Sequence, residues 1–285
     1  MLLMEDKQIF FNMNIFSLKD KVIIVTGASG LLGFEHCKAI ASAGGIPILL
    51  DLDKNKLESQ VKELKKKYNV ISSGFCIDIT DEKSIKDNCA IILKKYGKID
   101  GLVNNAANNP KMESSDNINF TRLENFPINI WDNDLDVSLK GTFLCIKHYG
   151  YQISKNKNGG SIINISSDLG LIAPDQSLYE VENLDESQQP VKPITYSVVK
   201  TGLIGITRYV STYWAKKNVR VNAICPGGVE NNQTSDFVKK LVKKIPLNRM
   251  ANKNEYQGLI IFLLSSASSY LNGAIISADG GRTAW

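Results

Sequence analysis

Apolar runs of strand length alternate with amphipathic stretches of helix length from residue 21 to the end of the chain. This alternation is typical of βαβ units, in which a helix connects two parallel strands. Several apolar runs lack polar alternation, as expected for strands that helices cover on both faces. We predict seven strands, at 21–26, 46–51, 69–78, 99–105, 160–167, 219–224 and 273–279. Helices are predicted at 30–43, 54–68, 81–96, 131–154, 196–217 and 253–266.

The pattern predicts an α/β fold, a single doubly wound Rossmann domain with a seven-stranded parallel sheet and helices on both faces. We expect this domain to span residues 17–285 and residues 1–16 to form an N-terminal extension. Two polar or proline-containing segments, 106–130 and 168–195, are predicted as long loops. Both follow the carboxyl ends of strands, where open α/β sheets bind ligands, so they are candidates for substrate contacts as well as for solvated decoration.

Charge, apolar run lengths and cysteine spacing exclude several classes of function. The 285 residues carry 34 basic and 29 acidic side chains, and most basic residues are lysines along predicted helices, so we expect no nucleic-acid partner. No apolar run approaches the roughly 18 residues of a membrane helix, and Glu5 and Asp6 stand where a secretory signal carries positive charge. Five irregularly spaced cysteines without a CxxC pair predict free thiols and no metal site. We expect a cytoplasmic protein with no membrane partner.

A glycine-rich segment, TGASGLLG, follows the first predicted strand and precedes the first helix. Gly27, Gly30 and Gly33 fit a turn in which the backbone approaches a pyrophosphate and the helix N-terminus faces the anion. Asp51 ends the second strand, where a carboxylate accepts hydrogen bonds from ribose hydroxyls and repels a 2′-phosphate. The sequence therefore predicts a dinucleotide site that favours NAD over NADP. A purely structural turn and a helix-capping role for Asp51 are the alternatives.

Tyr196 and Lys200, in TYSVVK, are spaced to lie on one face of a helix. A nearby ammonium lowers the pKa of a phenol and allows proton transfer near neutral pH. Tyr151–Lys155 and Tyr213–Lys217 share the spacing, but these pairs fall late in helices, where we expect lysine to face solvent or complement the helix dipole. We therefore expect Tyr196 to move a proton while a nicotinamide moves the hydride.

Two polar features surround this pair in the sequence. Ser166 and Ser167 end the fifth predicted strand, where a hydroxyl can hydrogen-bond a substrate oxygen, although serines at strand ends are also common turn residues. An acidic run at 180–186 lies in the second long loop. It would favour an amino group on the substrate, exclude phosphates, or simply face solvent.

Six motifs, in order, resemble those of the short-chain dehydrogenase/reductase family from residue 17 onward. They are TGASGLLG, NNAA (104–107), NISS, YSVVK, NAICPGGV (222–229) and the terminal ADGG. Within the family the chain is similar to the flagellin modification protein A type of oxidoreductase, through the segment between NISS and YSVVK, PGGVENNQ and the ending DGGRTAW. That narrower resemblance implies a role in surface-glycan biosynthesis.

The family resemblance implies roles for individual residues. Ser167 would orient the substrate, Tyr196 would act as acid or base, and Lys200 would bind ribose and lower the tyrosine pKa. The implied cofactor contacts are Gly27, Ser29, Gly30, Leu32, Gly33, Asp51, Asp78, Ile79, Asn104, Ala106, Tyr196, Lys200, Pro226, Gly227 and Val229. Asp78 would bind the adenine amino group or only start the next helix.

Three positions depart from the family pattern. Leu31 stands where the middle glycine is usual, with Gly30 one place earlier, and NNAA replaces NNAG. Ser138 stands where the family usually has an asparagine that holds a water in the proton relay beyond the lysine. Either its shorter hydroxyl still binds that water or the relay is impaired. We include Ser138 among the catalytic positions and expect activity to survive.

The leading hypothesis is an NAD-dependent oxidoreductase that interconverts a secondary alcohol and a ketone in a small carbohydrate, a sugar or sugar phosphate of flagellin modification. By resemblance, helices 131–154 and 196–217 would pack against their copies in a homodimer or homotetramer. Two other functions stay open. One is a non-catalytic nucleotide-binding or interaction module of the same fold, and the other is a nucleotide-sugar dehydratase or epimerase.

Overall fold

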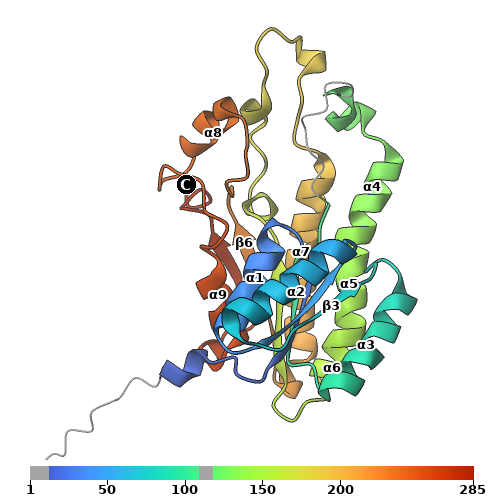
Figure 1. Cartoon of the computed structure of the whole chain (residues 1–285). Helices are drawn as coiled ribbons and strands as arrows, with labels where there is room; N and C mark the ends of the chain where they lie inside the picture. The colour runs from blue at the N-terminus through green and yellow to red at the C-terminus, as the bar shows by residue number, and fades with distance from the viewer. Residues whose placement is uncertain (1–12, 109–117) are drawn as a thin grey trace, which may run out of the picture.

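Seven parallel strands form one sheet in the order β3-β2-β1-β4-β5-β6-β7 in the computed structural model (Figure 1), which describes residues 13–108 and 118–285. The strands are β1 (Val22–Thr26), β2 (Ile46–Asp51), β3 (Ser73–Cys76), β4 (Gly101–Asn104), β5 (Gly160–Ile165), β6 (Val219–Pro226) and β7 (Ile275–Ala278). The strand order reverses between β1 and β4, which creates a crevice at their carboxyl ends. The predicted doubly wound Rossmann fold is confirmed.

Helices fill the connections between these strands. The α-helices are α1 (Leu31–Ser42), α2 (Lys54–Tyr68), α3 (Glu82–Tyr96), α4 (Ile128–Leu135), α5 (Gly141–Cys145), α6 (Tyr151–Ile153), α7 (Ile194–Tyr213), α8 (Ser235–Val242) and α9 (Gln257–Leu264). Two π-helical segments, η4 (Asp136–Lys140) and η5 (Ile146–Gly150), join α4, α5 and α6 into one continuous helix. The 3₁₀ segments are η1 (Met13–Phe16), η2 (Ile118–Thr121), η3 (Leu123–Asn125), η6 (Asp168–Gly170), η7 (Gln176–Tyr179), η8 (Glu186–Gln188), η9 (Ala215–Lys217) and η10 (Ser266–Ser268).

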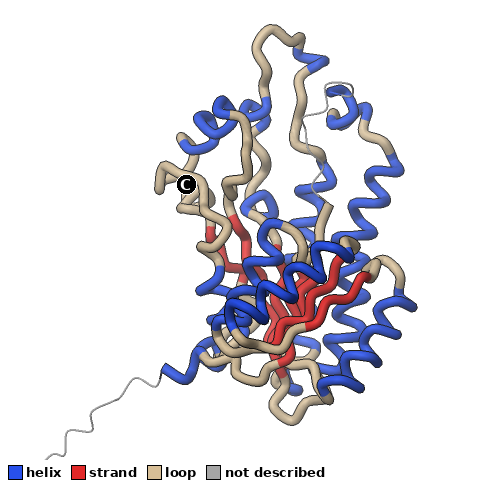
Figure 2. The backbone as a smooth tube through the Cα atoms, in the orientation of Figure 1, coloured by secondary structure: helices blue, strands red, loops and turns tan. Residues whose placement is uncertain are grey.

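The sheet is buried on both faces, as Figure 2 shows by the strands lying between helices. Successive side chains of a strand point to opposite faces, so Ile23 and Val25 of β1 pack with α1, α2 and α9, whereas Val22 and Ile24 pack with α3, the α5–α6 helix and α7. All four side chains are almost fully buried. This two-sided burial explains the continuous apolar runs in the sequence.

Local capping fixes where the helices after β2 and β3 begin. Asp53 accepts a hydrogen bond from the backbone N–H of Lys56 at the start of α2, and Asp81 accepts one from Lys83 at the start of α3. These caps leave the capping alternative for Asp51 without support, because Asp53 holds that position.

The chain departs from the predicted elements in its C-terminal third and in the long loops. Helix α8 was not predicted, although Thr234 caps it by accepting from the N–H of Phe237. The predicted loop 168–195 contains three 3₁₀ segments, and β3 is shorter than the predicted 69–78 because its flanks leave the sheet. Residues 1–12 of the expected extension and 109–117 of the first expected loop lie outside the described residues. No helix in the described ranges has the length and apolar character needed to cross a bilayer.

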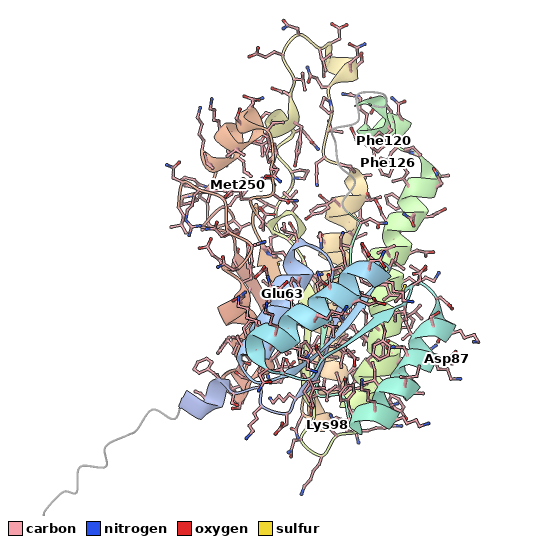
Figure 3. All side chains as sticks on the ribbon, in the orientation of Figure 1. Glu63, Asp87, Lys98, Phe120, Phe126 and Met250 are labelled. Carbon is pink, nitrogen blue, oxygen red and sulfur yellow. The ribbon has the colours of Figure 1, made fainter. Side chains whose placement is uncertain are left out.

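Three segments extend beyond the carboxyl edge of the sheet (Figure 1). They are the N-terminal part of α4, the segment between β5 and α7, and α8. A small apolar cluster of Leu178, Leu241, Ile245 and Met250 packs the segment around η7 against α8. Figure 3 shows Met250 on the α8 side of this region and Phe120 and Phe126 on the α4 side. The long connections therefore build walls above the strand ends.

Candidate active site

A cleft of about 610 Å³ lies at the carboxyl edge of the sheet. Its lining comes from the turn after β1, the ends of β2, β4, β5 and β6, the start of α7 and the segment after β7. The volume falls within the range of small-molecule pockets. The reversal of strand order between β1 and β4 lies along this cleft, which is where open α/β sheets bind nucleotides.

The glycine turn after β1 suits the close approach of a pyrophosphate. Gly27 has φ +61°, and a Cβ at Gly33 would lie 2.0 Å from the Gly27 carbonyl oxygen, so both positions need glycine. Gly30 is the N-cap of α1 and supplies no side-chain cap, which leaves the first N–H groups of the helix available to an anion. Leu31 begins α1 with its side chain exposed. The residues present therefore fit a dinucleotide.

A network of hydrogen bonds joins β1 to β4 at the switch point. Thr26 Oγ1 accepts from the N–H groups of Asn105 and Ala106 at 3.0 and 3.1 Å. Asn105 Nδ2 donates to the carbonyl oxygens of Thr26 and Gly27 at 3.0 and 3.1 Å. Asn104, the predicted contact, instead lies buried in the sheet and donates to Asn164 Oδ1 at 2.8 Å. Asn105 therefore shapes the glycine turn directly.

Two acidic side chains, Asp51 and Asp78, lie at the end of the cleft that the glycine turn forms. Asp51 Oδ2 accepts from the N–H of Ser29 at 2.8 Å, and its Oδ1 accepts from the N–H of Leu52 at 2.8 Å. The carboxylate lines the cleft and keeps lone pairs for ribose hydroxyls. Asp78 also lines it, while its Oδ1 accepts from both the N–H and the hydroxyl of Thr80 at 2.8 Å. Asp78 therefore forms a local turn and does not cap α3.

A buried ion pair holds the segment after β7 against the end of β5. Ser167 Oγ donates to Asp168 Oδ1 at 2.7 Å, and the N–H of Leu169 donates to the same carboxylate oxygen at 2.8 Å. Asp168 Oδ2 accepts from Arg282 Nη1 at 2.7 Å. Both charged side chains are less than a tenth exposed. Ser167 is thus positioned by a carboxylate that a C-terminal arginine neutralises.

Tyr196 and Lys200 enter the cleft from the first turns of α7. Lys200 Nζ donates to the carbonyl oxygen of Ile165 at 3.0 Å and lies 5.7 Å from the centroid of the Tyr196 ring. Burial, and to a lesser extent the charge of Lys192, lowers the pKa of Lys200 to about 8. The other two tyrosine–lysine pairs of this spacing do not line the cleft.

The pKa of Tyr196 differs from the sequence-based expectation. Burial raises it above its ordinary value, a hydrogen bond with Ser167 lowers it, and the charge of Asp168 raises it again. The expected lowering by Lys200 is therefore not found, because removal of the phenolate from water is the largest influence on this group. At neutral pH the phenol of Tyr196 carries its proton.

Ser138 lies in the π-helical segment η4, and only 1% of its surface is exposed. Its hydroxyl has no hydrogen-bond partner among the described residues, and it does not line the cleft. A buried hydroxyl of this kind is suited to bind a water. The neighbouring Val137 reaches the cleft instead.

Most of the residues singled out in the sequence come together in this cleft. Those that line it are Gly27, Ser29, Gly30, Leu32, Asp51, Asp78, Ile79, Ala106, Ser166, Ser167, Tyr196, Lys200, Pro226, Gly227 and Val229. Gly33, Asn104 and Ser138 lie behind its surface. Each of these three is covered by packing: Gly33 against the glycine turn, Asn104 between strands, and Ser138 within its helix.

Several polar residues that line the cleft were not among the predicted site residues, and they include Lys56, Asn105, Asp168, Lys192 and Arg282. Asn105 lies within the quoted motif NNAA and Asp168 directly follows NISS, and this placement was an available signal. Lys192 and Arg282 lie on irregular segments whose paths no periodicity predicts. The acidic run at 180–186 is exposed at all four carboxylates and does not line the cleft, so solvation accounts for it.

Comparisons with known proteins agree with this geometry. The family model for short chain dehydrogenase matches residues 21–180, and a model described as Enoyl-(Acyl carrier protein) reductase matches residues 185–283. A 2-dehydro-3-deoxy-D-gluconate 5-dehydrogenase of Dickeya dadantii is 30% identical, covering 94% of this chain and 98% of the relative. The post-translational flagellin modification protein A of Campylobacter coli is 31% identical, covering 93% and 98%.

A solved structure shares the fold along almost the whole chain. The NADPH-dependent 3-quinuclidinone reductase of Rhodotorula rubra is 26% identical, with a TM-score of 0.78, and the match covers 94% of this chain and 93% of that one.

The Asp168–Arg282 pair generates a stability prediction. Arg282→Met leaves a buried carboxylate without its counter-charge, so we expect the free energy of unfolding in urea to fall by about 3 to 5 kcal/mol. Adding Asp168→Asn removes that charge and should restore most of the loss. Equal unfolding midpoints for the wild type and Arg282→Met would show that the pair contributes nothing.

Proposed function

The chain belongs to the short-chain dehydrogenase/reductase family and is an oxidoreductase acting on alcohol or ketone groups, and from this premise we propose that it interconverts a secondary alcohol and a ketone in a small carbohydrate, with NAD as cofactor. The observation that carries the proposal is the meeting of Ser167, Tyr196 and Lys200 at one end of a cleft whose other end holds the glycine turn and Asp51. This set favours an enzyme over a nucleotide-binding module that lacks chemistry.

The side chains divide the work of the reaction. The nicotinamide supplies or accepts the hydride when bound. Tyr196, protonated at neutral pH, donates its proton to the substrate oxygen as a ketone is reduced and takes it back during oxidation. Ser167 orients that oxygen, and Lys200, whose ammonium also bonds the Ile165 carbonyl oxygen, would hold the ribose of the cofactor. The unpartnered hydroxyl of Ser138 holds a water that continues the proton path.

The cofactor preference rests on charge at the far end of the cleft. The carboxylate of Asp51 would repel a 2′-phosphate, which supports NAD. Lys56 lines the same end, but its ammonium lies 3.4 Å from Asp53 Oδ2, which offsets its attraction for a phosphate. The Rhodotorula reductase is NADPH-dependent, so the shared fold does not decide the cofactor. We infer the preference for NAD from the residues of this chain.

The biological setting is inferred from relatives and from the thiols. One relative acts on a sugar acid and another modifies flagellin, and these names support a carbohydrate substrate and a role in surface-glycan biosynthesis. All five cysteines are free, which supports a reducing compartment such as the cytoplasm.

An exposed aromatic surface supports self-association. Tyr209 and Tyr213 of α7 are 67% and 65% exposed and stack with their ring centroids 5.8 Å apart. Phe143, on the neighbouring α5, is 55% exposed. Exposed aromatic groups of this kind mark interaction surfaces, and we assign this one to a second copy of the chain in a homodimer or homotetramer.

Tyr196→Phe tests the catalytic assignment. The variant loses only the hydroxyl, so it should bind NADH as the wild type does while its turnover falls by about 10²- to 10⁴-fold, the usual contribution of a positioned acid. The measurements are fluorescence titration with NADH and absorbance assays over a panel of polyols and ketoses. Tyr151→Phe, which alters a tyrosine of the same spacing outside the cleft, is the control. Preserved turnover in Tyr196→Phe refutes the assignment.

Asp51→Asn tests the cofactor assignment. The asparagine oxygen can still accept from the Ser29 N–H, but the charge is gone. Like charges about 4 Å apart repel by about 1 to 4 kcal/mol, so we expect the ratio of kcat/KM for NAD to that for NADP to fall roughly tenfold or more. A wild type that prefers NADP, or an unchanged ratio in the variant, contradicts the role given to this carboxylate.

The aromatic surface is tested by the mass of the particle in solution. Light scattering after size exclusion should give two or four chains for the wild type, and the Tyr209→Lys, Tyr213→Lys double variant should shift toward one chain. Tyr270→Lys changes a fully exposed tyrosine elsewhere and should leave the mass unaltered. A monomeric wild type ends the proposal.

A further inference from the structure

Lys192 occupies an unassigned position at the substrate end of the cleft. It precedes α7 by two residues, lines the cleft, and places Nζ 3.9 Å from the centroid of the Tyr196 ring. This ammonium is closer to the phenol ring than that of Lys200, at 5.7 Å. Because the hydroxyl of Tyr196 transfers the proton in the proposed reaction, a cation held against the face of its ring must lie near the reacting part of the substrate.

The charge balance at this end of the cleft favours an anion. Lys192, Lys200 and Arg282 all line it, whereas Asp168 is the only acidic side chain among the described lining residues near Tyr196. The two oxygens of Asp168 already accept three hydrogen bonds, including the one from Arg282. The other lining acids, Asp51 and Asp78, belong to the glycine-turn end. Even when the nearby buried carboxylate of Asp134 is counted, three cations stand against two carboxylates among the described residues at this end.

Burial makes the ammonium of Lys192 receptive to such a group. Removal from water lowers its pKa to about 8, while the carboxylates of Asp168 and Asp134 oppose the shift. Asp134 is itself buried and accepts from Thr195 Oγ1 at 2.6 Å. At neutral pH the ammonium is still charged, and an anionic ligand would restore the electrostatic stabilisation that burial removes.

We propose that Lys192 binds an anionic group of the substrate, a carboxylate or a phosphate close to the carbon that is oxidised or reduced, and so selects charged over neutral carbohydrates. Lysine is a compact point charge that accepts either oxyanion. This inference deepens the proposed function and rests on it for the identity of the ligand as substrate. The binding site itself can be tested without turnover.

Binding of matched small molecules tests the site directly. Tartrate and threitol share a four-carbon chain with two interior hydroxyl groups, but tartrate ends in carboxylates and threitol in hydroxymethyl groups. Calorimetric titration of the wild type with NADH present should show tartrate, or inorganic phosphate, binding at least tenfold more tightly than threitol. The tighter of the two anions identifies the source of the charge. Failure of both anions to bind overturns the proposal.

Variants identify the residue responsible. Lys192→Met should weaken anion binding by about tenfold or more without changing threitol binding, and Lys192→Arg should restore most of the affinity. Lys155→Met is the matched control, because Lys155 also lies over a tyrosine ring, 4.2 Å from the Tyr151 centroid, but outside the cleft. Anion affinity that is equal in the wild type and Lys192→Met overturns the proposal.

Assays of turnover separate this inference from the proposed function. If sugar acids or sugar phosphates turn over and Lys192→Met raises KM for them alone, both stand. If neutral polyols turn over equally well in the wild type and in Lys192→Met, the oxidoreductase assignment stands and the anion selectivity fails. If no carbohydrate turns over but anion binding still depends on Lys192, the binding site stands and the catalytic proposal fails.

Discussion

The common direction of the seven strands is the constraint on which the site depends. Because every strand ends at the same edge, the glycine turn after β1, Asp51 at the end of β2 and Ser167 after β5 reach one cleft although they are far apart in the chain. The bonds from Asn105 to Thr26 and Gly27 fix the two strand ends between which the order reverses. A shift of β4 relative to β1 would break these bonds and move the glycine turn away from the catalytic side chains.

The sequence predicts the framework well because a buried parallel sheet produces a clear pattern of apolar positions along the chain. Strands covered on both faces read as continuous apolar runs, and amphipathic helices separate them. Tyr196 could be chosen over two tyrosines of equal spacing because it follows a strand and begins a helix, and the structure places only this one in the cleft. Helix α8 was missed even though Thr234 provides an N-cap, because its eight residues follow no strand-length run.

What the sequence could not supply is burial and the path of irregular segments. The pKa of Tyr196 was expected to fall because an ammonium stands four residues away, but spacing does not reveal how far the ring is removed from water. Likewise, nothing in the local pattern around Lys192 or Arg282 shows that these residues, 90 positions apart in the chain, line the same cleft. These contacts depend on connections whose backbones follow neither helical nor strand periodicity.

The single hydroxyl proton of Ser167 can be donated either to Asp168 or to the substrate oxygen. This choice links the buried ion pair to the chemistry. The proton points to Asp168 Oδ1, yet orienting a ketone requires that it turn toward the substrate oxygen. Rotation of the hydroxyl costs little free energy, because Asp168 Oδ1 still accepts a hydrogen bond from the N–H of Leu169 and Oδ2 still accepts one from Arg282. If Arg282 were absent, the carboxylate would depend on Ser167 more strongly and hold its proton away from the substrate. In the proposed mechanism the C-terminal segment would thus act on the reaction without touching the substrate oxygen, because Arg282 bonds the neighbouring carboxylate and leaves the Ser167 hydroxyl free to rotate.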